Sequence, residues 1–68
     1  MKLKINGQQK LLNSKVQLSE LIRLELNGKD AKGIAAAVNS KIVPKQQWES
    51  TILNENDSVE IVHAVQGG

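Results

Sequence analysis

The sequence contains no cysteine and a single histidine, His63. Disulfide bonds, thiolate metal sites and a zinc site built from several histidines are therefore excluded, and we expect neither a metal nor a bound cofactor. A chain of 68 residues buries only about 60% of the surface that it exposes when unfolded. Packing and hydrogen bonding must therefore hold the fold together. The lack of cysteine fits a reducing compartment, and we expect a cytoplasmic protein.

Aromatic side chains are almost absent too, since Trp48 stands alone without any Phe or Tyr. Nine Lys and Arg against seven Asp and Glu give a net charge of +2, and the basic residues are spread along the chain. A nucleic-acid binder needs a basic stripe, with aromatics if it reads single strands, so a small basic nucleic-acid binder is the weakest hypothesis. No apolar run approaches the roughly 20 residues that span a bilayer, and we expect no membrane partner. The alternating, charged start of the chain is also unlike a signal peptide.

Alternating polar and apolar residues predict strands near both ends of the chain. Residues 2–5 place Leu3 and Ile5 on one face, as in a half-buried strand. Asn6-Gly7 follows, a strong hairpin signal because both residues tolerate positive φ, and residues 8–12 form the returning strand. Residues 59–65 are the most apolar stretch, so we expect this last strand to join the sheet and pack against a helix.

One helix is predicted between the strand pairs. The spacing i, i+3, i+4, i+8 defines a single apolar face, formed by Leu18, Leu21, Ile22 and Leu26. Asn27-Gly28 is a typical helix end, whereas Gln17 is a poor N-terminal cap. Leu24 lies off the apolar stripe.

The middle of the chain supplies the remaining elements. Residues 34–38 predict a short strand that runs into the turn pair Asn39-Ser40 and then a second apolar pair. Residues 45–49 predict a turn or a single helical turn. The order β-β-α-β-(β)-β, with one helix on a mixed sheet, is an α+β arrangement. We expect a domain over residues 1–65 and a flexible tail over 66–68.

The tail is the candidate reactive site, because the rest of the chain shows no acid/base pair and no phosphate-binding loop. Gly67-Gly68 would present a carboxylate on a narrow stalk that adopts backbone angles closed to other residues. A terminal carboxylate is ionised at neutral pH and is a poor electrophile until a partner activates it. The alternative is a frayed end without a function.

Two segments, residues 37–48 (AVNSKIVPKQQW) and 53–61 (LNENDSVEI), together with the closing Gly67-Gly68, resemble the ThiS family of thiamine-biosynthesis sulfur carriers. Residues 37–48 are similar to the family pattern A-[VIL]-N-x-x-[IV]-V-P-[RK]-x-x-W. Residues 53–61 are similar to L-x-x-G-D-x-[VI]-E-[IL], and Gly-Gly follows as in the family. Asn56 stands where glycine is usual, although Asn tolerates the same left-handed turn, and Gln17 stands where Thr or Ser is common.

The resemblance implies a β-grasp, ubiquitin-like fold and a carrier that is not itself an enzyme. An E1-like activating enzyme would adenylate the carboxylate of Gly68 with Mg-ATP. Sulfur from a cysteine-desulfurase pathway would then form a C-terminal thiocarboxylate, which would donate sulfur to thiazole synthase. Gly67 would let the tail thread into the partners' active sites.

Glu60, Val62 and Ala64 share one side of the last strand, and we expect this side to meet a partner while the opposite side packs on the helix. Trp48 is expected to be a packing anchor. Three alternatives stay open: a related Gly-Gly carrier for molybdopterin synthesis, a ubiquitin-like protein modifier, and a non-covalent ubiquitin-like interaction module.

Overall fold

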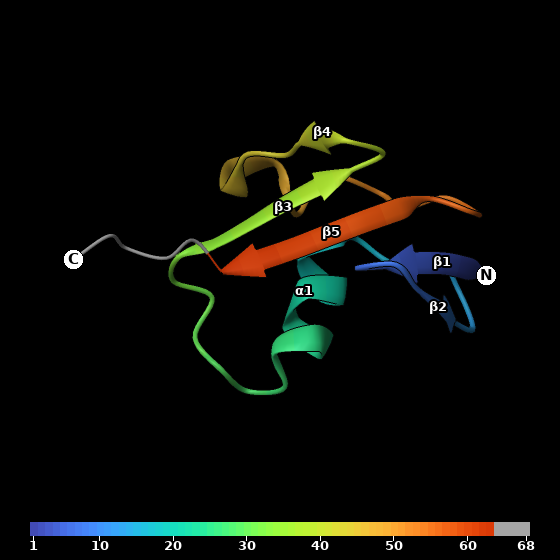
Figure 1. Ribbon diagram of the computed structural model, residues 1–68, viewed down its shortest axis with the longest axis horizontal. Helices are drawn as coiled ribbons and strands as arrows, with labels where there is room; N and C mark the ends of the chain where they lie inside the picture. Colours follow the sequence, from blue (N-terminus) through green and yellow to red (C-terminus); the bar gives the residue numbers. More distant parts are fainter. Residues whose placement is uncertain (64–68) are drawn as a thin grey trace.

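The computed structural model describes residues 1–63 as a five-stranded mixed sheet with one α-helix packed on one face (Figure 1). The elements in chain order are β1 (Lys2–Ile5), β2 (Gln8–Leu11), α1 (Leu18–Leu26), β3 (Ile34–Val38), β4 (Lys41–Ile42), the 3-10 helix η1 (Lys45–Gln47) and β5 (Ser58–His63). The predicted order β-β-α-β-(β)-β is confirmed, and the bracketed strand is β4. The expected boundary between a domain at 1–65 and a tail at 66–68 lies outside the described residues.

The first hairpin forms where the sequence predicts it. Asn6 and Gly7 have φ of 52° and 83°, the left-handed pair that a two-residue hairpin turn requires. β1 and β2 pair antiparallel from Lys2↔Leu11 to Ile5↔Gln8, so β2 ends one residue earlier than predicted.

Helix α1 has the predicted bounds and the predicted caps. Asn27 is the C-terminal cap of α1 and adopts the left-handed conformation, with φ 52° and ψ 51°. This conformation ends the helix and turns the backbone away from the helix axis. Gln17 makes no side-chain capping hydrogen bond, in line with its poor capping propensity. Leu24 is 56% exposed, consistent with its place off the apolar stripe.

Strand β5 is the centre of the sheet, whose order is β2-β1-β5-β3-β4. It runs parallel to β1 through Lys4↔Ser58 and Ile5↔Val59 and antiparallel to β3 from Val38↔Val59 to Ile34↔His63. The prediction that the last strand joins the sheet is therefore confirmed. Its expected continuation to Val65 lies outside the described residues.

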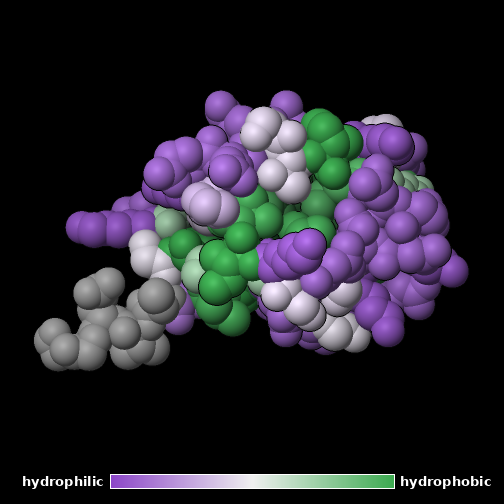
Figure 2. Space-filling view, turned by 90° about the horizontal axis from the view of Figure 1, so that it is seen from above, coloured by the Kyte–Doolittle hydropathy of each residue, from purple (hydrophilic) through white to green (hydrophobic). Residues whose placement is uncertain are grey.

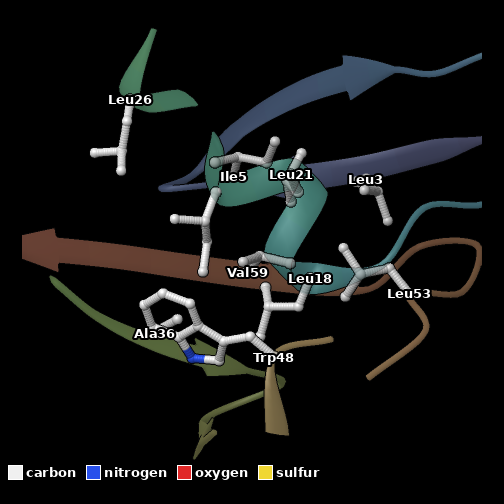
Figure 3. Packing of buried hydrophobic residues seen from close by; sticks show 10 residues of the cluster. Leu3, Ile5, Leu18, Leu21, Leu26, Ala36, Trp48, Leu53 and Val59 are labelled. Carbon is white, nitrogen blue, oxygen red and sulfur yellow. The ribbon is translucent and has the colours of Figure 1, made fainter. Parts of the chain in front are cut away.

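The hydrophobic core lies between α1 and the sheet (Figure 3). It consists of Leu3, Ile5, Leu18, Leu21, Ile22, Leu26, Ala36, Trp48, Leu53 and Val59. Trp48 is 6% exposed, and its indole Nε1 donates a hydrogen bond to the carbonyl oxygen of Val43 at 2.9 Å. The indole thus ties the segment after β4 into the core, which confirms Trp48 as a packing anchor.

Carboxylates in the turns bind backbone amides. Asp30 accepts from the N–H of Lys32 at 3.0 Å, Glu55 from that of Lys2 at 3.1 Å, and Asp57 from that of Asn54 at 2.8 Å. Asp30 and Asp57 therefore stabilise their own turns, as is typical of Asp, while Glu55 connects its turn to β1.

The left-handed turns also use Asn as predicted. Asn56, which replaces the family's usual glycine, has φ 69°. Asn39 has φ 51°; its amide donates to Oδ1 of Asp57 at 3.0 Å and its Oδ1 accepts from the N–H of Ser58 at 3.0 Å. The two sequence motifs are thus joined by contacts between the β3–β4 turn and the start of β5.

Candidate functional site

The predicted site residues divide into two groups. Gly67, Gly68 and Ala64 lie outside residues 1–63, so the structure describes the part of the site that leads to them. Glu60 and Val62 lie on β5, and both are exposed. The described part of the candidate site is therefore the last strand and the sheet surface around it.

β5 is held on one edge up to its last described residue, His63, and on the other edge up to Ile61. On one edge β3 pairs with it as far as Ile34↔His63. On the other edge β1 turns away at Asn6, whose side chain accepts a hydrogen bond from the N–H of Ile61 at 2.8 Å and donates one to the carbonyl oxygen of Ile61 at 3.1 Å. The described part of β5 is thus hydrogen-bonded to the sheet close to the point where it leads to the tail.

The two sides of β5 differ in burial, and the helix-facing side packs on the core as predicted. Val59 is fully buried and Ile61 packs partly against the core, beneath α1. Val62 is 55% exposed on the other side. His63, which falls on the helix-facing side by alternation, is exposed.

The exposed side of β5 continues into an apolar surface that we call the outer sheet face: Ala35, Ala37, Ile42, Glu60 and Val62. Val62 pairs with Ala35, and Ala37 pairs with both Glu60 and Ile42. These residues line a shallow hollow of ≈ 240 Å³. Figure 2 shows hydrophobic side chains gathered in a band across the side of the molecule where β3 and β4 lie.

Sequence reasoning missed Ile42, which is 78% exposed on the edge strand β4 and borders this face. Its position follows from the two-residue turn at Asn39-Ser40, which sets Ile42 opposite Ala37. The signal in the sequence was the alternation of residues 34–38, which puts Ala35 and Ala37 on the side of the strand away from the core. Because the alanine side chains are short, the larger side chains of Ile42 and Val62 project from the sheet and are exposed.

Residues 1–63 offer an apolar surface on which a partner could dock. None of these residues form a cluster of three or more potential metal-binding His, Asp or Glu side chains, and none of their buried side chains is polar or charged. No helix in this part of the chain is long and apolar enough to cross a bilayer. The outer sheet face can bury apolar area against a partner, with Glu60 at its border.

Comparisons with known proteins agree with one another. The ThiS family model matches residues 3–68. A thiazole synthase from Paramagnetospirillum magneticum is 35% identical over 68 residues, which is 100% of this chain and 20% of that protein. The chain thus spans about a fifth of that relative's length. The uncharacterized protein ycf40 of Porphyra purpurea is 33% identical over 97% of this chain and 90% of its own length.

Solved structures share the fold. The crystal structure of a thiamine biosynthesis protein (ThiS) from Geobacter metallireducens superposes with a TM-score of 0.84 over 100% of both chains, at 21% identity. An NMR structure of a thiamine biosynthesis protein from the same organism gives a TM-score of 0.76 over 88% of its chain. The mixed sheet with one helix is thus the β-grasp fold expected from the sequence.

Proposed function

Since this chain belongs to the ThiS family, we propose that it carries sulfur for thiamine biosynthesis on the carboxyl group of Gly68. The observation that carries the proposal is the extent of the family match, which runs over residues 3–68 and so includes Gly67-Gly68. The likeness to a protein named thiazole synthase supports the same pathway. The chain would be a carrier on which partner enzymes act, and not a catalyst.

The proposed chemistry begins with activation of the tail. The carboxylate of Gly68 attacks the α-phosphate of Mg-ATP in an E1-like activating enzyme, which gives an acyl-adenylate and releases pyrophosphate. A persulfide from a cysteine-desulfurase pathway then attacks the acyl carbon, and AMP leaves, which gives an acyl disulfide. A partner's thiol attacks the sulfur on the partner side of this bond, so that a disulfide forms between the two partner sulfurs and the thiocarboxylate is released. The thiocarboxylate passes its sulfur to thiazole synthase. The cytoplasm is the proposed location of this reaction, in line with the lack of cysteine.

The two glycines suit this chemistry for a steric reason. A glycine has no Cβ, so Gly67 and Gly68 can pass through a channel too narrow for other residues and adopt the backbone angles that an active site imposes. The outer sheet face adjoins the strand that leads to them. We therefore propose it as the surface that docks on the activating enzyme, with Ile42 and Val62 supplying most of the buried apolar area.

Intact mass spectrometry tests the proposal directly. The protein produced in its own cells first gives the native mass, which establishes whether Gly68 carries the free carboxyl group. Incubation with the activating enzyme, Mg-ATP and a sulfur donor should then add about 16 Da, because one oxygen is exchanged for sulfur at an activated acyl group. Omission of ATP is the control and should leave the mass unchanged.

A protein that gains no mass, yet still binds its partner after Gly67 and Gly68 are deleted, would be a non-covalent interaction module. Transfer of the sulfur to a molybdopterin precursor in place of thiazole synthase would assign the related carrier function.

A further inference from the structure

A second surface lies on the helix side of the sheet, away from the outer sheet face. It is an open groove of ≈ 440 Å³ between the C-terminal half of α1, the loop that follows α1, and η1. We call it the α1–η1 groove. Its floor is apolar and is formed by Ile22, Leu26 and Trp48.

The rim of the α1–η1 groove is mainly basic. Arg23 on α1, Lys29 in the loop and Lys45 on η1 stand around the floor, against one carboxylate, Glu49. Lys29 and Lys45 form no ion pair within residues 1–63, and the pair of Arg23 with Glu20 is exposed, at 3.4 Å. An exposed pair of this kind contributes little, so Arg23 can exchange Glu20 for another carboxylate.

The distribution of these charges distinguishes among occupants. A small anion would need several donors converging on one point, ideally with a buried polar side chain to orient it. Here the three cations stand on three separate segments around an apolar floor, and no polar or charged side chain is buried among the described residues. An extended chain that places carboxylates on the rim and an apolar side chain on the floor matches both features.

The groove is also at the end of the molecule from which a partner would approach the tail. The loop that contains Lys29 leads directly into Ile34, the residue paired with His63 at the described end of β5. Figure 1 shows this loop curving round to the end of β5. A protein that holds the end of β5 would therefore pass close to the groove.

We propose that the α1–η1 groove binds an acidic segment of a partner protein, with one large apolar side chain of that segment seated against Leu26 and Trp48. This interaction goes beyond the proposed sulfur transfer, since it assigns a second binding surface on the opposite side of the sheet. The carboxylates of the segment pair with Arg23, Lys29 and Lys45.

Three synthetic peptides test the proposal with the full-length protein. The acidic probe has one leucine between two runs of glutamate; the neutral probe has glutamine for glutamate; the third probe has serine for leucine. Trp48 is the only aromatic residue, so its fluorescence and its Nε1–H resonance report on the floor of the groove. The acidic probe should bind saturably and should shift the Trp48 fluorescence, the Trp48 Nε1–H resonance and the backbone amide resonance of Lys29. The other two probes should bind roughly tenfold more weakly.

Paired variants separate the groove from general charge effects. Lys29→Glu combined with Lys45→Glu should weaken binding of the acidic probe by roughly tenfold. Lys2→Glu combined with Lys4→Glu makes the same change of net charge on β1, outside the groove lining, and should leave binding nearly unchanged. Equal weakening by both pairs would overturn the proposal.

Three further results would overturn it. Equal binding of the three peptides would show that neither charge nor the apolar anchor matters. Equal shifts with inorganic phosphate would assign the groove to a small anion. Shifts on concentrating the protein alone would assign it to a second copy. Because the mass gain at Gly68 is measured without these peptides, the sulfur-carrier proposal stands or falls separately.

Discussion

The side-chain amide of Asn6 pairs with the backbone of Ile61 through two hydrogen bonds, although the two residues are 55 positions apart. The N–H and carbonyl of a strand residue point to the same edge, and those of Ile61 point toward β1. β1 has already turned away at that point, because Asn6 itself has φ 52°. The amide therefore takes the place of the next β1 residue and extends the two-sided support of β5 toward the tail.

Asn6→Gly should loosen the end of β5 without unfolding the protein. Glycine keeps the positive φ but removes both hydrogen bonds, each worth about 1 kcal/mol. Hydrogen exchange at the Ile61 amide should accelerate at least roughly fivefold. Asn27→Gly is the matched control, because Asn27 has the same φ of 52° and sits at the end of α1. If both variants accelerate exchange at Ile61 equally, the role assigned to Asn6 is wrong.

Val62→Glu should impair docking on the activating enzyme while preserving the fold. The new carboxylate would be buried without a partner in the proposed interface, so KM for the carrier should rise by roughly tenfold or more. Leu24→Glu is the control, since Leu24 is 56% exposed and Val62 55%. Thermal unfolding should be nearly unchanged for both variants. Unaltered thiocarboxylate formation by Val62→Glu would remove the outer sheet face from the proposal.

Trp48→Phe should destabilise the protein through two losses. The carbonyl of Val43 loses its donor, and the smaller ring leaves space in the core, at a combined cost of about 2–3 kcal/mol. The net stability of a domain this small is roughly 3–5 kcal/mol. The Trp48→Phe variant should therefore fold, but its unfolding midpoint should fall at a much lower urea concentration than that of the unmodified protein. Ser50→Ala removes an exposed hydrogen bond to Gln47 in the same segment and should have little effect. Equal urea unfolding midpoints for Trp48→Phe and Ser50→Ala would contradict the anchoring role of Trp48.

Asn39→Asp should weaken the connection between the two sequence motifs. The substitution replaces the amide donor with a carboxylate oxygen facing Asp57, and Asp tolerates the left-handed backbone. We expect a loss of about 1–2 kcal/mol, partly recovered at high salt because the charges are exposed. Asn13→Asp makes the same change in an exposed loop and should be nearly neutral. A salt-independent loss would show that repulsion from Asp57 is not its cause.

Local signals predicted most of the fold. The bounds of α1 follow from the spacing of Leu18 to Leu26 and the stop at Asn27-Gly28, and the first hairpin follows from Asn6-Gly7. These features act within a few residues along the chain, so the sequence displays them directly.

Contacts between distant segments could not be predicted in the same way. The pairing of Ile42 with Ala37 follows from the local turn at Asn39-Ser40. The pairing of Val62 with Ala35 depends on how β5 flanks β3, which no local pattern records. The same holds for Asn6, whose turn-forming role was evident while its hydrogen bonds to Ile61 were not. The outer sheet face was therefore only half predicted, from Glu60 and Val62, and Ala64 stays a prediction.

Fragmentation of the intact protein in a mass spectrometer after activation locates the sulfur within the chain. We predict that the gain of about 16 Da from oxygen-to-sulfur exchange appears in C-terminal fragments as short as Gly68 and in no N-terminal fragment that lacks it. A gain located within residues 1–66, or no gain with an activating enzyme shown to be active on another carrier, would contradict the claim that sulfur travels on the Gly68 carboxyl group.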